Sequence, residues 1–399
     1  MTQIFRLYRD AYAGLSPATW WLSLVMLVNR SGTMVIPFMT LYMTTKLGYS
    51  IAQAGWVMAL FGAGAVCGGL IGGKLIDRLG FHFIQIATLF GGGILFIILG
   101  QMKSYPMICL FAFILSLIND MFRPANSAAI AHYSKEANRT RSFSLNRLAI
   151  NLGWAMGGAL GGFIASKDYE LLFWIDGFTN MSAALLLYFA LSPSRTKAVA
   201  PKPAGIKPLN IQSAYKDKPY MVFIVMTILF AFSFFQLFTT LPVYYRQELH
   251  LTESFIGLTM ALNGILIASL EMVLIHKLEG RRHILQYIMI GVLMIAVSFM
   301  MFNVFPGAEW LALASMLFMT FGEMFAMPFM NTYWVTRTVT ENRGQYAGLF
   351  TVAWSIAQVL GPGTGAQIAD RFGFEVLWWL IGGILVVSAF GYKWLERKN

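Results

Sequence analysis

Four charged side chains stand inside long apolar stretches of the sequence, where a charge is costly. Placing an arginine or a carboxylate at the centre of a bilayer costs roughly 2.5–3.5 kcal/mol on insertion scales, so such residues mark candidate functional sites. A carboxylate in this setting can bind and release a proton, and an arginine can hold a carboxylate or phosphate group. The four candidates are Arg30, Asp120, Arg123 and Glu323.

Asp120 and Arg123 are separated by three positions, which places them on one face of a helix. One interpretation is a structural salt bridge, in which Asp120 pairs with Arg30 or Arg123 and holds two helices together. Such a pair can also open while the protein works, so Asp120 remains a candidate proton-coupling residue.

Glu323 has no lysine or arginine within two turns of its own helix. It is therefore the first candidate for a group that loads and unloads a proton near neutral pH. The alternative is a permanently protonated side chain that is hydrogen-bonded to a neighbour. Glu271 is a second candidate, or a side chain that reaches the membrane surface. Arg147 is either functional or extends to the interface.

The composition identifies the elements that must position these residues. Of the 399 residues, 57% are hydrophobic and 12% are charged, whereas soluble domains carry about 25% charged residues. The apolar residues form runs of about 20 without strand-like alternation, which predicts membrane-spanning helices and not a barrel. We expect an all-α integral membrane protein of about twelve transmembrane helices, at roughly 18–43, 51–76, 82–100, 105–133, 140–166, 171–191, 219–246, 253–276, 283–304, 310–337, 344–367 and 374–395.

The basic residues set the expected orientation. Most of the 29 lysines and arginines lie in the tails and in the loops on the same side as the termini, which predicts that both termini are cytoplasmic. The opposite loops hold few: Lys46, Lys103, Lys167, Arg246 and Arg371. A basic, proline-rich segment at 192–218 is interpreted as a cytoplasmic linker between a six-helix bundle at 1–191 and a second one at 219–399.

The two predicted bundles repeat one another in sequence. The segment that begins at Asn138 matches the one that begins at Asn342, and the same shift aligns Asn119 with Glu323. An internal repeat of this length is typical of carriers that rock two bundles about a central site.

The loop after the second helix reads GGKLIDRLGFHF and resembles a cytoplasmic signature of the major facilitator superfamily. The matching residues include Gly73, Asp77, Arg78 and Gly80, and the resemblance implies that they gate the inner side. Phe81 and the histidine that follows it stand where that signature has two basic residues.

The fifth helix resembles the glycine motif of the drug:proton antiporters of that superfamily, with Gly153, Gly157 and Gly161 in place. Its proline form occurs instead in the eleventh helix, at Gly361 and Pro362. The fourth helix lacks the R-x-x-x-G pattern that those antiporters usually carry.

The superfamily fold implies that helices 1, 4, 7 and 10 line a central cavity. The substrate-binding candidates are therefore the polar residues of these helices: Asn29, Arg30, Asn119, Arg123, Gln236 and Glu323.

We therefore expect a proton-coupled secondary transporter of the bacterial inner membrane, working by alternating access as a monomer among membrane lipids. The first hypothesis is export of amphipathic compounds or drugs by proton antiport. The second is a carrier of an anionic or zwitterionic metabolite, such as a small peptide or organic acid. A receptor or enzyme on the same fold is the third, which the lack of a catalytic motif disfavours. Sodium coupling and import stay open, and no cofactor, metal ion or nucleic acid is expected.

Overall fold

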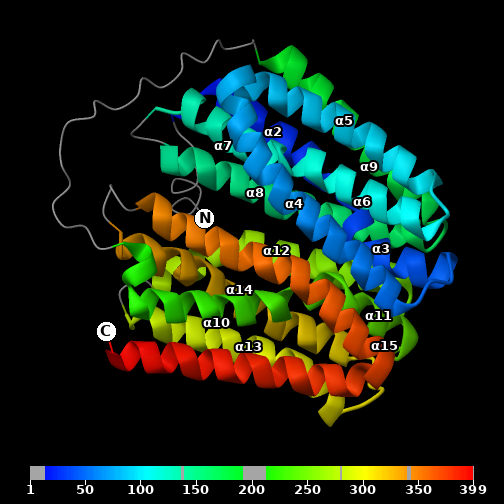
Figure 1. Cartoon of the computed structure of the whole chain (residues 1–399), viewed down its shortest axis with the longest axis vertical. Coiled ribbons are helices and arrows are strands. Elements are labelled where there is room, and N and C mark those ends of the chain that lie inside the picture. The colour runs from blue at the N-terminus through cyan, green and yellow to red at the C-terminus, as the bar shows by residue number, and fades with distance from the viewer. Residues whose placement is uncertain (1–13, 136–138, 192–212, 279–280, 339–342, 399) are drawn as a thin grey trace, which may run out of the picture. The chain divides into compact units, whose positions relative to one another are not determined.

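The computed structural model describes residues 14–135, 139–191, 213–278, 281–338 and 343–398. All regular elements in these residues are helical (Figure 1). The chain runs through α2 (Pro17–Ser31), α3 (Val35–Leu41), α4 (Ile51–Leu79), α5 (Phe81–Gln101), α6 (Tyr105–Asp120), α7 (Phe122–Tyr133), α8 (Arg139–Ala165), α9 (Glu170–Ala190), α10 (Lys218–Phe234), α11 (Thr240–Gln247), α12 (Glu253–Leu278), α13 (Ile284–Val304), α14 (Leu311–Thr336) and α15 (Arg343–Lys398).

The described residues contain 11 helical segments that are long and apolar enough to cross a membrane. The last of them, within α15, is two helices joined at Gly373, whose φ of +83° is not helical. A glycine suits this position because a positive φ carries no steric penalty without a Cβ atom. The predicted all-α membrane fold of twelve helices is thus confirmed.

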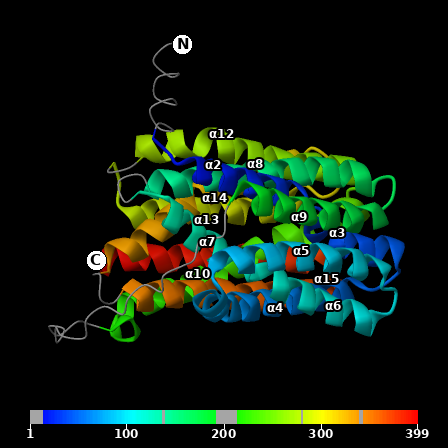
Figure 2. The same ribbon diagram turned by 90° about the horizontal axis from the view of Figure 1, so that it is seen from above.

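By packing, the chain forms two units, one with residues 1–36 and 61–200 and the other with residues 37–60 and 201–399. In the first unit α5 lies beside α9, and α2 beside α8 (Figure 1). In the second unit α13 lies beside α14 (Figure 2), and α15 packs on α10 and α13. Packing thus groups residues 37–60 with the second unit. Residues 192–212 of the predicted linker lie outside the described residues, and the predicted domain boundaries remain a prediction.

Three of the predicted membrane helices are interrupted, which the apolar runs did not indicate. The first is broken between Ser31 and Val35, and the seventh passes through a 3₁₀ turn at Phe235–Phe238. The fourth is interrupted after Asp120. Pro124 accounts for this last break, because proline has no N–H to bond the carbonyl four residues earlier.

Asp176 of α9 stabilises the break in the first helix. Its carboxylate is fully buried and accepts hydrogen bonds from the backbone N–H groups of Met34 and Val35, at 2.9–3.1 Å. These N–H groups lie at the start of α3, where no preceding helical turn supplies acceptors, and that of Met34 also donates to the carbonyl oxygen of Gly32 at 2.9 Å. One turn further along α9, Asn180 accepts a 2.8 Å hydrogen bond from Asn29 of α2. The α9 helix therefore holds both sides of the break.

Replacing Asp176 with alanine should lower the free energy of unfolding by roughly 1–3 kcal/mol, because the buried hydrogen bonds that it accepts from the backbone are lost. Asp176→Asn, which keeps one acceptor oxygen, should lose less. Thermal unfolding in detergent measures this, with Glu309→Ala in an exposed loop as control. Equal melting temperatures for Asp176→Ala and the control would contradict the role of Asp176.

Candidate functional site

Arg30 lies at the end of α2, next to the break in the first helix. Its side chain is half-buried, and its Nε atom is buried with no hydrogen-bond partner among the described residues. The charged groups that act on it are Asp120 and Arg123. Three of the four charges predicted to matter, all in the first unit, are therefore neighbours.

Asp120 pairs with Arg123 and not with Arg30. The Arg123 Nε atom lies 3.1 Å from the Asp120 Oδ1 atom, and Ser116 donates a 3.3 Å hydrogen bond to Oδ2. The Asp120 side chain is 13% exposed and that of Arg123 is 66% exposed. The pair therefore follows the i, i+3 spacing of the sequence. The buried Nε atom of Arg30 is left available to donate a hydrogen bond to a ligand.

The two asparagines beside these charges face their neighbouring helices. Asn29 is buried and bonded to Asn180, as described above. Asn119 packs against α5, where a Cβ atom added to Gly92 would lie 3.2 Å from its Oδ1 atom. Both side chains therefore contact protein, and their proposed contact with substrate is untested.

The glycines of α8 bring that helix against the backbone that carries Arg30. A Cβ atom on Gly153 would lie 2.4 Å from the Arg30 Cβ atom, and one on Gly157 would lie 3.2 Å from the Arg30 carbonyl oxygen. No real side chain tolerates the first distance, so Gly153 is required for this approach. In the second unit, a Cβ atom on Gly361 would lie 3.0 Å from the carbonyl oxygen of Phe232. Small residues thus bring helices 5 and 1, and helices 11 and 7, into close contact.

Glu323 lies in the middle of α14 and is 7% exposed. Its Oε1 atom accepts a 3.2 Å hydrogen bond from Asn263 of α12, and Asn263 also donates to Thr320 at 3.0 Å. The charged group that acts on Glu323 is Glu271, which lies two turns along α12 from Asn263 and is also buried. Within the described residues no lysine or arginine forms an ion pair with Glu323. Glu323 is therefore a buried carboxyl group that is hydrogen-bonded to the Asn263 side-chain amide and lies near a second acidic residue.

Both the nitrogen and the oxygen of the Gln236 side-chain amide form hydrogen bonds within the protein. Its Nε2 atom donates to the carbonyl oxygen of Gly361 at 2.9 Å, and its Oε1 atom accepts from Thr240 at 2.9 Å. The side chain is fully buried at the 3₁₀ turn of the seventh helix. It ties that turn to α15, which is a structural task that the sequence did not indicate.

An aromatic cluster joins α10 and α15 close to this turn. Trp354 packs edge-on against Phe230, Phe234 and Phe235, with ring centroids 6.0–6.2 Å apart. Trp354 and Phe235 are only half-buried. The cluster therefore presents an apolar, polarisable surface that belongs to the same unit as Glu323.

The predicted gating loop ends α4. Gly80 has a φ of +82° and separates α4 from α5, which explains why this position needs glycine. Gly73 lies within α4 and Arg78 is exposed in its last turn. The side chain of Asp77 lies outside the described part of the structure, so its proposed gating role stays a prediction.

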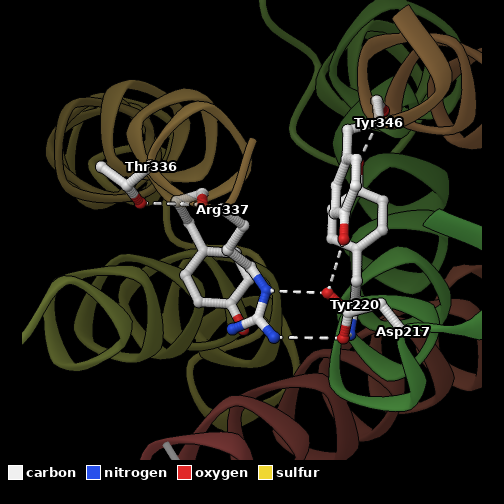
Figure 3. A network of polar contacts seen from close by, with 6 residues as sticks. Asp217, Tyr220, Thr336, Arg337 and Tyr346 are labelled. Atoms are coloured by element: carbon white, nitrogen blue, oxygen red, sulfur yellow. Dashed lines mark hydrogen bonds and ion pairs between the residues drawn. The ribbon is translucent and has the colours of Figure 1, made fainter. Parts of the chain in front are cut away.

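A network of polar side chains surrounds the N-terminus of α10 (Figure 3). Asp217 accepts hydrogen bonds from two guanidinium nitrogens of Arg337, at 3.1 and 3.2 Å, and from the Tyr346 hydroxyl at 2.8 Å. It also caps α10 through the backbone N–H of Tyr220. Arg337 in turn donates to the hydroxyl of Tyr333 and lies over its ring. The network joins the first residues of α10 to the end of α14 and the start of α15.

The charge of Asp217 is stabilised by this network. Burial alone raises the pKa of Asp217, but the hydrogen bonds from Arg337 and Tyr346 outweigh burial and hold the pKa below the ordinary carboxyl value. The carboxylate is therefore ionised at neutral pH and forms a two-bond ion pair with Arg337.

Sequence reasoning missed two parts of these sites. Asn263 was visible as a lone amide in an apolar helix, but its partner on α14 depends on how the helices pack. Asp217 and Arg337 are separated by 120 residues, and each resembled an ordinary charge at a helix end. The network between them therefore had no local signal.

Membrane helices in two repeated bundles, with charged side chains near mid-span, define a membrane transporter. The model of the Major Facilitator Superfamily matches residues 21–362. The chain therefore belongs to the Major Facilitator Superfamily. This family and the relatives found are transporters of small molecules and not enzymes.

Relatives and solved structures agree over almost the whole chain. The uncharacterised MFS-type transporter YqjV of Bacillus subtilis (strain 168) is 24% identical, covering 96% of this chain and 96% of its own. The Na(+), Li(+), K(+)/H(+) antiporter of Planococcus maritimus is 23% identical, covering 92% and 93%. The crystal structure of peptide transporter POT in complex with sulfate has a TM-score of 0.79 at 17% identity, covering 97% of this chain and 96% of that one.

The Asp217 network predicts a defined pH dependence of stability. Because the pKa of Asp217 is lower in the folded protein, its contribution is fully present above the unfolded carboxyl pKa and is lost as pH falls through the folded pKa. Asp217→Asn should therefore destabilise the protein by roughly 3 kcal/mol at neutral pH. The difference from the unmodified protein should shrink as the pH falls below about 4. Thermal unfolding across this range tests it, and a constant difference would contradict the ionised pair.

Proposed function

We propose that this transporter is a proton-coupled antiporter that exports amphipathic compounds by alternating access, with Glu323 as its proton-binding group. We place it in a bacterial inner membrane with both termini cytoplasmic, because the basic residues concentrate in the loops on that side. The main support is that Glu323 is buried and is hydrogen-bonded to an amide, not to a cation, within the described residues.

Glu323 is suited to exchange a proton because no lysine or arginine of the described residues forms an ion pair with it. Asn263 can donate to it when it is ionised, and the same amide group can reorient to accept from it when it is protonated. Burial disfavours the charged form unless it is paired, so charge on Glu323 is tolerable only when a cationic substrate is close. Proton and substrate would then alternate at one carboxylate.

Two further observations favour an amphipathic, cationic substrate. The half-buried Trp354 and Phe235 offer aromatic faces, which attract apolar and cationic groups. The glycine pattern of α8 resembles that of drug:proton antiporters. A relative named as a cation/proton antiporter adds support for exchange against protons.

Glu323→Gln, which mimics the protonated form, should abolish pH-driven uphill transport of a cationic substrate, and it should leave exchange of an uncharged substrate without a pH gradient intact. The assay is flux in proteoliposomes with and without an imposed pH step, measured for a transported amphipathic cation, such as ethidium, and for an uncharged substrate. The matched control is Glu309→Gln, an exposed glutamate outside the helices. If Glu323→Gln responds to the pH step as the unmodified protein does, the proton site lies elsewhere, with Asp120 or Glu271 the next candidates.

Arg30 supports a second candidate function, the transport of an anionic or zwitterionic metabolite. Its buried Nε atom has no protein partner in the described residues, and Asp120 is already paired with Arg123. A guanidinium group in this condition suits a carboxylate ligand.

If the substrate carries a carboxylate, Arg30→Gln should weaken its binding by at least about thirtyfold, the effect of truncating a buried charge partner. Binding of candidate peptides and organic acids to the purified protein measures this, with exposed Arg371→Gln as control. Thermal unfolding of both variants must first show intact protein. Undiminished carboxylate binding by folded Arg30→Gln would exclude this candidate.

A further inference from the structure

A groove of about 490 Å³ runs between α13 and the second half of α15, within the second unit. Its walls are apolar over most of its length and cationic at one end. The lining residues are Met289 and Leu293 from α13, with Ala389, Phe390, Lys393, Trp394 and Arg397 from α15.

The order of the lining residues gives the groove an amphiphilic axis. Positions 389, 393 and 397 are four residues apart and share one face of the helix. The apolar residues Ala389 and Phe390 come first, and the cations Lys393 and Arg397 follow in the last turns of the chain. About 12 Å of helix separates Ala389 from Arg397, at 1.5 Å per residue.

The cationic end carries an excess of positive charge. Lys393 forms a 3.0 Å ion pair with Glu396, which also accepts a hydrogen bond from Gln286 of α13. Arg397 and Lys398 are exposed, and Lys398 lies 4.8 Å from the ring centroid of Trp394. Glu396 is already used by Lys393 and Gln286, and the described residues show no ion pair for Arg397 or Lys398, so these two cations are available to an anion.

We propose that this groove binds an anionic phospholipid, with an acyl chain along the apolar wall and the phosphate at Arg397 and Lys398. Arginine and lysine are the usual phosphate partners, and basic sites between membrane helices bind anionic headgroups. The exposed Trp394 stands between the apolar and cationic parts, where tryptophan is favoured at the membrane interface. The apolar wall accepts the chain of any lipid, whereas the cations select the charged headgroup.

This inference is independent of the transported substrate. With the orientation proposed above, the cationic end faces the cytoplasmic leaflet, which is the leaflet that attracts basic segments through its anionic lipids. The phosphate alone could also come from a soluble anion, so the acyl chain must be tested separately.

The test is the binding of phosphatidylglycerol and of phosphatidylcholine to the purified full chain, measured by native mass spectrometry in detergent. The variant Arg397→Gln/Lys398→Gln should bind phosphatidylglycerol more weakly, by about fivefold for each charge removed, with phosphatidylcholine unaffected. The control Lys216→Gln/Lys218→Gln removes two exposed charges outside the groove and should bind both lipids normally. Equal melting temperatures in phosphatidylcholine would show that the variants are folded.

A second variant tests the apolar wall without changing any charge. Leu293→Trp fills the groove from α13 and should also weaken phosphatidylglycerol binding, while glycerol phosphate without acyl chains should not compete with the lipid. Equal binding of the two lipids to the unmodified protein would overturn the proposal. So would an equal loss in the control variant, or competition by glycerol phosphate.

Discussion

The hydrocarbon interior of a bilayer offers no hydrogen-bond partners, so every polar group placed there must find one inside the protein. The interrupted helices of this chain show the consequence. Asp176 supplies acceptors for the N–H groups that the break in the first helix exposes. Gln236 bonds across the turn in the seventh helix to the backbone of Gly361. In both places a polar side chain bonds the interruption to a neighbouring helix.

The same constraint makes Arg30 and Glu323 candidate functional residues, because no ion pair within the described residues holds their charge. The two bundles repeat one another, yet equivalent positions have diverged in chemistry. Glycines of helices 5 and 11 pack on the first and seventh helices in the same way, and they contact Arg30 in one bundle and Phe232 in the other. Asn119 of the first bundle corresponds to Glu323 of the second. At these equivalent positions the first bundle thus carries Arg30 and Asn119, and the second carries Phe232 and Glu323.

The fold could be predicted from the sequence far better than the site. Apolar runs fixed the helix boundaries to within a few residues, because the length of a membrane helix is set by the bilayer. The i, i+3 spacing made Asp120 and Arg123 possible partners, and they are paired. The break at Met34 was not predictable, because it depends on Asp176, which lies 142 residues away in the chain. Asn263 was missed for the same reason, since its contact with Glu323 exists only once α12 packs on α14.

The proposed role of Glu323 is to take up and release a proton within the membrane. Infrared difference spectra of the purified protein between acidic and alkaline pH measure this directly, because only a protonated carboxyl group shows the C=O stretch of an acid. We expect that the unmodified protein loses one such band as the pH is raised, and that Glu323→Gln lacks this band. The same band in Glu323→Gln, or no change in the unmodified protein, would contradict the account.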